Sequence, residues 1–403
     1  MTPERLRPLA LVLLAAAGTF ALTMGARQSM GLFIGPINTQ TGLGLASVSL
    51  AFAFGQLWWG LTQPLAGIVT DRYGPGRVIV TGVLLVALGT ALIPFMTSTA
   101  GLVLAIGVLA AGGAGMAGPS TLMAATTRLV PPERRGLATG VVNAGGSFGQ
   151  FLFAPIAQAI TTAAGWAVAV QTLAALTLLA LPAAWALRAP AASPAPAGAP
   201  PEGTRAAVAR ALADPSYRLL AAGFFVCGFH VAFLATHMPG VVASCGLAPE
   251  IGAWSLAMLG LFNIVGSLGI GWIMSRGPWR LKSLLSAIYA IRGVAVLVFV
   301  FAPKTPAVML GFAAVMGLTF LSTVPPTAGL VARFFGPAHM ATLFGLVMVT
   351  HQVGGFLGAW LGGKAFEANG SFDWIWYADI VLAAGAALLH LPIREVQPRL
   401  QQV

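Results

Sequence analysis

Charged residues make up only 8% of this chain of 403 residues, whereas apolar residues make up 58%. A soluble domain has about 25% charged residues, because its surface must be solvated by water. So few charges cannot cover such a surface, which excludes a soluble enzyme. Intrinsic disorder is also excluded, since disordered segments have low hydrophobicity. The composition therefore predicts an all-α polytopic membrane protein whose surface contacts mostly lipid.

Apolar stretches long enough to cross a bilayer, which takes about 20 residues, follow one another along the chain. They fall near residues 9–35, 46–69, 78–97, 101–127, 137–160, 166–187, 219–243, 252–274, 281–302, 306–331, 341–363 and 374–392. Backbone groups in lipid must be hydrogen-bonded within the structure, so we expect twelve transmembrane helices and no open strands.

The segment 188–218, between the sixth and seventh stretches, is rich in Ala, Pro and Gly and carries scattered charges. Such a composition is typical of a flexible linker, and we expect one short helix in it near residues 204–213. The predicted organisation is therefore an N-terminal six-helix bundle over 1–187, the linker, and a C-terminal six-helix bundle over 219–403.

The 21 Lys and Arg residues lie between the apolar stretches, which argues against a nucleic-acid partner for this basic chain. With the N-terminus inside, 17 of the 21 fall in cytoplasmic segments, and the external loops hold only Lys304 and Lys364. Because basic loops stay in the cytoplasm, both termini and the linker are predicted to be cytoplasmic, in the inner (plasma) membrane of a bacterial-type cell.

The two halves of the sequence resemble each other at a constant shift of 205 residues. This shift places Gly18 on Gly223, Gly112 on Gly317, Arg128 on Arg333, Pro132 on Pro337, Gly140 on Gly345 and Gly149 on Gly354. Internal duplication of a six-helix unit is typical of transporters, in which two halves rock about a site near the membrane midplane.

A loop motif after the second stretch points to a known family. The segment Gly67-Ile-Val-Thr-Asp71-Arg72-Tyr-Gly74-Pro-Gly-Arg77 resembles the GxxxD[RK]xG signature of the major facilitator superfamily, and a degenerate copy, Gly271 to Arg280, follows the eighth stretch with Ser275 in place of the acid. The resemblance implies a gating role for Asp71, Arg72 and Arg77, which can cap helix ends and pair across the halves. The alternative is a tight turn that anchors the topology.

The fifth stretch is similar to a segment of the monocarboxylate porters within that superfamily. It carries Arg134-Arg135-Gly-Leu137-Ala138-Thr-Gly140, then Ala144-Gly145, Gly149 and Ala154-Pro155, in the order of those porters' RRxLAxG…AG…G…AP run. Arg27-Gln28-Ser29 to Phe33 likewise resembles the basic-x-Ser element of their first span. The resemblance adds Arg134 and Arg135 to the gating candidates. The acid–arginine pair of the porters' eighth span is absent, because its positions fall near Asn263 and Ser267.

Ionised side chains are costly in lipid, so those retained within spans usually face a cavity. Of the ten acidic residues, only Asp379 enters a predicted span, near its outer end. The predicted interior instead holds Arg27, Arg292 and three of the five histidines. A site with positive but no negative groups attracts anions, which disfavours carriers of organic cations and symporters that depend on a buried carboxylate.

The candidate substrate-binding residues are the polar groups of these spans: Arg27, Gln28, Asn143, His230, His237, Tyr289, Arg292, His351 and Gln352. Arg27 can grip a carboxylate with two hydrogen bonds, or it can extend to the external interface. Arg292 lies on one helix face with Tyr289 and can contact either a ligand or neighbouring carbonyls. His230 and His237, two turns apart on one face, can carry a proton, contact the substrate or bond the backbone.

We therefore expect a secondary transporter, not an enzyme, which moves a small organic anion, a monocarboxylate, together with a proton. The chain has no GxxxxGK[ST] phosphate-binding motif, and its two cysteines are too few for a metal cluster or a disulfide framework. We predict no metal and no cofactor, and a monomer in the lipid bilayer. The alternatives are an efflux transporter for drugs or other amphipathic compounds, and a non-transporting membrane receptor.

Overall fold

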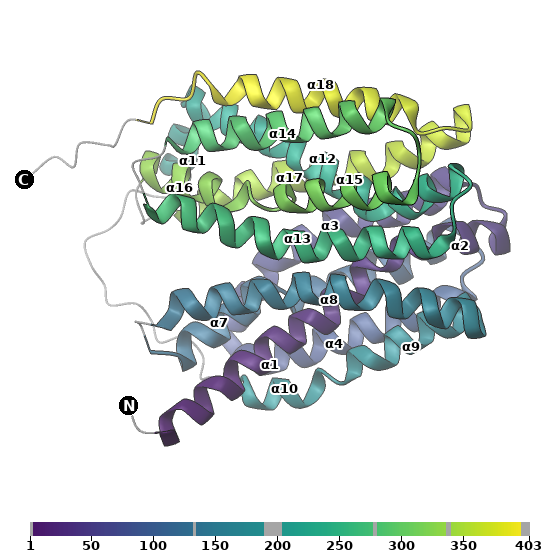
Figure 1. Ribbon diagram of the computed structural model, residues 1–403. Helices are drawn as coiled ribbons and strands as arrows, with labels where there is room; N and C mark the ends of the chain where they lie inside the picture. The colour runs from purple at the N-terminus through teal and green to yellow at the C-terminus, as the bar shows by residue number, and fades with distance from the viewer. Residues whose placement is uncertain (1–2, 132–133, 189–203, 277–279, 336–339, 396–403) are drawn as a thin grey trace, which may run out of the picture.

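The computed structural model describes residues 3–131, 134–188, 204–276, 280–335 and 340–395, and these residues form helices and no strands. Ten helical segments are both long and apolar enough to cross a membrane. Two further helices, α8 (Arg135–Ala164) and α18 (Asp373–His390), run alongside them, with α8 packed on α1 and α13 and α18 packed on α14. Together they make the predicted twelve-helix bundle, whose helices run roughly parallel or antiparallel (Figure 1).

The first six spans begin at the N-terminus. They are α1 (Pro3–Gln28) continued by η1 (Met30–Phe33) and α2 (Ile34–Thr41), α3 (Leu45–Tyr73), α4 (Pro75–Leu92) with η2 (Ile93–Phe95), the series α5 (Thr99–Leu102), η3 (Val103–Ala110), α6 (Ala111–Met116) and α7 (Pro119–Leu129), α8, and α9 (Trp166–Leu178) with α10 (Leu181–Ala186). The next six are α12 (Pro215–Ser244), α13 (Pro249–Arg276), α14 (Leu281–Phe301), α15 (Pro306–Thr319) with α16 (Val324–Phe335), α17 (Met340–Asn369) and α18.

The predicted linker contains more helix than its composition indicates. The short helix α11 (Thr204–Ala213) occupies the expected place, and α12 already begins at Pro215, four residues before the predicted start of its span. The reason is a cap: the Asp214 carboxylate accepts hydrogen bonds from the backbone N–H groups of Ser216 and Tyr217, at 2.7 and 3.2 Å. Residues 189–203 of the linker lie outside the described part.

The fourth and tenth spans are both interrupted, and at equivalent places. The fourth breaks between α6 and α7 at residues 117–118, and the tenth between α15 and α16 at residues 320–323, which the shift of 205 residues brings into register. Pro119 follows the first break, and Pro325 and Pro326 follow the second. Proline lacks the N–H that would continue the helical ladder, so the two halves repeat the same discontinuous helix, a feature of transporter binding sites.

The two halves touch closely at one end of the bundle. There the backbone N–H of Ala46 in α3 donates to the Glu367 carboxylate in α17, at 2.8 Å. Glycines allow the approach: a Cβ on Gly363 of α17 would lie only 2.6 Å from the Ser49 Cβ of α3, and one on Gly260 of α13 would lie 2.8 Å from the Phe151 nitrogen of α8. The backbones of the two halves are therefore in contact at this closed end.

The same helices separate toward the other end, where both chain ends lie (Figure 1). A Cβ built on Gly67 of α3, Gly345 of α17, Gly140 of α8 or Gly269 of α13 meets no described atom within 4 Å. Among the described residues, the helices of the two halves therefore pack backbone to backbone at the closed end. We call the end that carries the termini, where these four glycines meet no described atom within 4 Å, the open end.

Candidate functional site

Two cavities lie where the halves face each other. The larger, of about 320 Å³, opens between α1, α3, α8, α13 and the break of the tenth span. Its wall is mainly apolar and aromatic, with Phe20, Trp59 and Phe320, and its polar groups are uncharged. Asn143 supplies one of these polar groups, as the sequence predicted for a substrate-binding residue.

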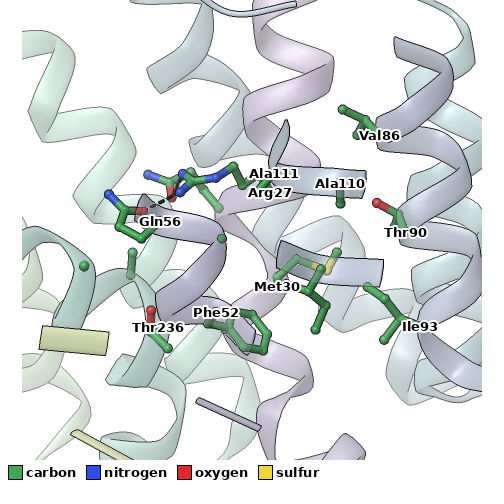
Figure 2. Close-up of a pocket in the computed structure, with 16 residues that line it drawn as sticks. Arg27, Met30, Phe52, Gln56, Val86, Thr90, Ile93, Ala110, Ala111 and Thr236 are labelled. Carbon is green, nitrogen blue, oxygen red and sulfur yellow. Dashed lines mark hydrogen bonds between the residues drawn. The ribbon is translucent and has the colours of Figure 1, made fainter. Parts of the chain in front are cut away.

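The smaller cavity, of about 50 Å³, lies nearer the closed end and is lined by Arg27, Gln28, Met30, Gln56, Thr90 and Thr236, among others (Figure 2). Gln28 lines both cavities. Arg27 is the only charged residue among those lining either cavity, so the positive charge of the interface between the halves is concentrated at this point.

Arg27 stands in the last turn of α1, where the helix gives way to η1. Its Nη2 donates a hydrogen bond to the side-chain oxygen of Gln56 in α3 (Figure 2), and its Nη1 lies 3.5 Å from the Gln28 Oε1. Its guanidinium carbon lies 4.9 Å from the ring centre of Trp59, a distance typical of a cation–π contact. All of these partners are neutral, and the guanidinium points between the halves rather than to an external interface.

Gln56 connects Arg27 to the other half of the protein. Its Nε2 donates to the Gln352 Oε1 in α17 at 3.1 Å. Two glycines make room for the amides, since a Cβ on Gly60 would lie 2.8 Å from the Gln352 Cδ and one on Gly355 would lie 2.7 Å from the Gln56 Cγ. The predicted site residues Arg27 and Gln352 are thus brought together, through a residue that the sequence reasoning did not single out.

Another polar contact between the halves lines the large cavity. Asn263 in α13 donates from Nδ2 to the Ser147 Oγ in α8 at 2.9 Å, and its Oδ1 accepts the backbone N–H of Leu321 at 3.1 Å. Leu321 lies in the break of the tenth span, so Asn263 satisfies a backbone group that the interrupted helix leaves free. This side chain therefore joins three helices at the cavity wall.

Tyr289 and Arg292 do not line either cavity. Arg292 is 1% exposed, and its Nη2 donates to the carbonyls of Thr319 and Phe320, the latter at 2.6 Å. The Tyr289 hydroxyl donates to the Gly223 carbonyl at 2.7 Å. Of the two contacts that the sequence left open for Arg292, the structure shows the one to carbonyls, at the point where the tenth span breaks.

The three candidate histidines, His230, His237 and His351, are buried in the C-terminal half, and none of the three lines the two cavities. The Nε2 of His237 lies 2.6 Å from the Ala359 carbonyl oxygen, and the His351 ring packs on Phe224 with 4.9 Å between ring centres. His230, near the midpoint of α12, has its Nε2 3.3 Å from the Asp379 Oδ1 and 3.2 Å from the Asp379 carbonyl oxygen.

The contact to Asp379 corrects the expectation that the interior holds no acid away from its outer ends. Asp379 is only 1% exposed, and it faces the middle of α12 rather than the end of the bundle. The position of Asp379 within its own span does not show which residue it faces, because that depends on how α18 packs beside α12 and α14. The acid is separate from Arg27, which has no acidic neighbour among the described residues.

The gating candidates lie at the open end. Arg72, Arg77 and Arg134 are exposed there, with the Arg72 guanidinium 5.4 Å from the ring centre of Tyr73. The side chains of Asp71 and Arg135 lie outside the described part of the structure, so their pairing stays a prediction.

Sequence patterns did not predict the contacts of Gln56, Trp59 and Asp379. Gln56 and Trp59 are one helical turn apart and both contact Arg27. Their stretch of sequence also holds Trp58, Thr62 and Gln63, so residue type alone does not single them out. The sequence places Asp379 within a span, but its partner His230 is 149 residues away.

Comparisons with known proteins agree with this architecture. A profile of the Major Facilitator Superfamily matches residues 13–359. Monocarboxylate transporter 13 of Rattus norvegicus is 27% identical over 95% of this chain and 88% of its own, and the Fujikurins efflux protein of Gibberella fujikuroi is 22% identical over 86% and 72%. A crystal structure of a bacterial homolog of the human lysosomal transporter Spinster, inward-facing and unoccupied, has a TM-score of 0.72 at 17% identity, over 97% of this chain and 94% of that one. The chain belongs to the Major Facilitator Superfamily and is a membrane transporter, not an enzyme.

Proposed function

We propose that this transporter carries a small monocarboxylate together with a proton, and that Arg27 binds the carboxylate. The observation that carries the proposal is the setting of Arg27: it is the only charged residue lining the two cavities, and its partners are Gln56, Gln28 and Trp59. A guanidinium presents several N–H donors in a fixed plane that matches a carboxylate. A neutral amide is a weaker partner than a carboxylate, so an incoming anion can replace Gln56.

The large cavity suits the rest of such a substrate. Its wall combines Phe20, Trp59 and Phe320 with uncharged polar groups, and Trp59 also stacks on Arg27. A carboxylate with a short apolar body therefore places its charge at Arg27 and its carbon chain against the aromatic wall. The name of the rat relative, monocarboxylate transporter 13, supports the same substrate class.

Replacement of Gln56 gives binding a route to conformational change. The amide of Gln56 bridges Arg27 and Gln352, which belong to opposite halves. An anion that takes the place of Gln56 on Arg27 changes this bridge at the closed end. Alternating access needs such differential contact, because a ligand shifts an equilibrium only through unequal affinity for its states.

The direction of opening follows from the predicted topology. The distribution of the 17 basic residues predicts that both termini lie in the cytoplasm of a bacterial-type cell, and the described glycines near the end that carries the termini meet no described atom of the opposite half within 4 Å. The described conformation is then open to the cytoplasm. The proton crosses either as the acidic hydrogen of the substrate or on a side chain of the protein.

Efflux of an amphipathic compound is the second candidate. The apolar wall of the large cavity favours it, and the similarity to the Fujikurins efflux protein supports it. The two candidates differ at Arg27, because an uncharged amphipathic substrate fills the large cavity without contacting that residue.

Transport by purified protein in proteoliposomes tests the proposal. Labelled lactate and pyruvate should accumulate, and faster with an inward proton gradient, whereas labelled organic cations should not. Uptake of cations or of uncharged amphipathic dyes without any uptake of monocarboxylates would reject the anion proposal in favour of the second candidate.

A further inference from the structure

The buried contact between His230 and Asp379 lies outside both cavities and has no role in the binding of a carboxylate at Arg27. Both side chains are 1% exposed. The His230 Nε2 is hydrogen-bonded to the Asp379 carbonyl oxygen and lies 3.3 Å from the Asp379 Oδ1, and the His230 Nδ1 has no hydrogen-bond partner. A membrane protein seldom keeps an ionisable pair inside its spans without a function for it.

Arg292 connects this pair to the break of the tenth span. Its Nη2 donates to the carbonyls of Thr319 and Phe320. The Phe320 carbonyl oxygen also lies 3.6 Å from the Cys227 Sγ, which is one helical turn before His230 on α12. The Nε and Nη1 of Arg292 have no acceptor, and neither carboxylate oxygen of Asp379 accepts a hydrogen bond. Free donors and free acceptors are thus present in the same buried cluster.

The break that Arg292 holds is part of the cavity wall. Phe320 and Leu321 line the large cavity, and the Thr323 Oγ1 lies 3.1 Å from the Cys227 Sγ on the inner side. The other titratable groups of this cluster are Cys227 in α12, Tyr289 in α14 and His351 in α17. A change in the position of Arg292 is therefore a change in the wall that faces the substrate.

We propose that His230 and Asp379 form the proton-binding site of the transporter, and that Arg292 transmits its protonation to the broken tenth span. The proposal rests on the proposed proton symport and names the site where the proton is carried. One proton from the water on one side binds the pair, which shares it as a coupled unit. The same proton leaves to the water on the opposite side after the halves have rocked.

The two protonation states differ in what Arg292 contacts. With the proton bound, Asp379 is neutral and Arg292 holds the carbonyls of Thr319 and Phe320, as in the described structure. With the proton released, the carboxylate is charged and attracts the free Nε and Nη1 of Arg292, which loosens the break. Protonation thereby sets the shape of the cavity wall.

Neutralising Asp379 separates proton coupling from substrate binding. In proteoliposomes, Asp379→Asn should retain exchange of internal unlabelled for external labelled lactate, since exchange needs no net proton movement. It should lose accumulation driven by a gradient of about one pH unit, which in the wild type reaches about tenfold for one proton per anion. Asp379→Glu should restore part of the accumulation, because it restores the proton-binding group.

Asp373→Asn is the matched control, since Asp373 lies in the first turn of the same helix, is exposed and contacts Ser371. It should accumulate lactate as the wild type does. An Asp379→Asn protein that still accumulates lactate with the proton gradient would overturn the proposal. If Asp379→Asn does not fold, His230→Gln provides the same test on the partner side chain.

A measurement without substrate distinguishes failure of this site from failure of the monocarboxylate proposal. The infrared difference spectrum of the purified protein between acidic and alkaline buffer should contain the C=O band of a protonated, buried carboxyl group. This band should be missing in Asp379→Asn and present in Asp373→Asn. Identical spectra for Asp379→Asn and the wild type would overturn the proton site, whichever substrate is transported.

Discussion

The guanidinium of Arg27 in α1 donates a hydrogen bond to the side-chain oxygen of Gln56 in α3 (Figure 2). The positive charge at the junction of the two halves is therefore held by a neutral amide and not by a carboxylate. Gln56 also donates to Gln352 of α17, so the residue that is hydrogen-bonded to Arg27 also joins the two halves.

Replacing this amide with a carboxylate should give Arg27 a permanent acidic partner and so block the proposed anion site. Gln56→Glu places a carboxylate against Arg27 and should weaken monocarboxylate binding by roughly a hundredfold or more, because a fixed negative charge repels the substrate. Gln63→Glu is the control, two turns along the same helix, where the side chain contacts Ser120 and the Trp59 carbonyl. Equilibrium binding of labelled lactate by both variants checks this, and unchanged binding by Gln56→Glu would contradict it.

Close packing of α3 and α17 should keep one end of the bundle shut. Gly363→Val introduces a side chain where even a Cβ would lie 2.8 Å from the Leu45 carbonyl oxygen, whereas Gly345→Val, on the same helix, meets open space. The test uses a protein with Cys227→Ala and Cys245→Ala, in which Thr236→Cys supplies one cysteine in the small cavity near the closed end. An impermeant thiol reagent added on the side of the membrane at the closed end should label this cysteine only when Gly363→Val is also present. Equal reactivity in the two valine variants would show that this contact does not close the bundle.

The apolar wall of the large cavity should favour longer carbon chains. Each additional buried CH₂ group contributes about 0.8 kcal/mol, so the inhibition constants of straight-chain monocarboxylates against lactate uptake should fall by about fourfold per CH₂. The trend should stop when the cavity of about 320 Å³ is filled. Affinity that is independent of chain length would place the substrate outside this cavity.

Topology reporters should give cytoplasmic signals at Ala195 in the linker and at Val403 at the end of the chain. The reason is the distribution of positive charge, with 17 of 21 basic residues on the side of the termini. A periplasmic signal at either position would contradict both the topology and the cytoplasmic opening of the cavity.

The sequence predicted the helical spans well because lipid restricts what can cross it. Apolar stretches of sufficient length, basic loops and the Gly67–Arg77 motif indicated the bundle and its family before any contact was known. The breaks at residues 117–118 and 320–323 were not predicted, although Pro119 directly follows the first, and Pro325 and Pro326 follow the second after Val324.

Sequence patterns did not predict which residues of different helices contact each other. The position of Arg292 within a span allowed a role in ligand binding, yet its guanidinium donates hydrogen bonds to the carbonyls of Thr319 and Phe320. Asp379 was placed near the end of a span, yet it faces His230. In both cases the residue's partner is set by how neighbouring helices pack, which a helix's own periodicity does not encode.

Initial rates of labelled lactate uptake by wild-type, Arg27→Lys and Arg27→Ala proteins in proteoliposomes test the central claim most directly. Removing a hydrogen bond to a charged group costs about 1.5–3 kcal/mol, so Arg27→Ala should weaken apparent affinity roughly ten- to hundredfold while the protein remains folded. Arg27→Lys should retain only part of the activity, because an ammonium group cannot bind a carboxylate with two parallel hydrogen bonds. Normal lactate uptake by the folded Arg27→Ala protein would contradict the assignment of Arg27 as the anion site.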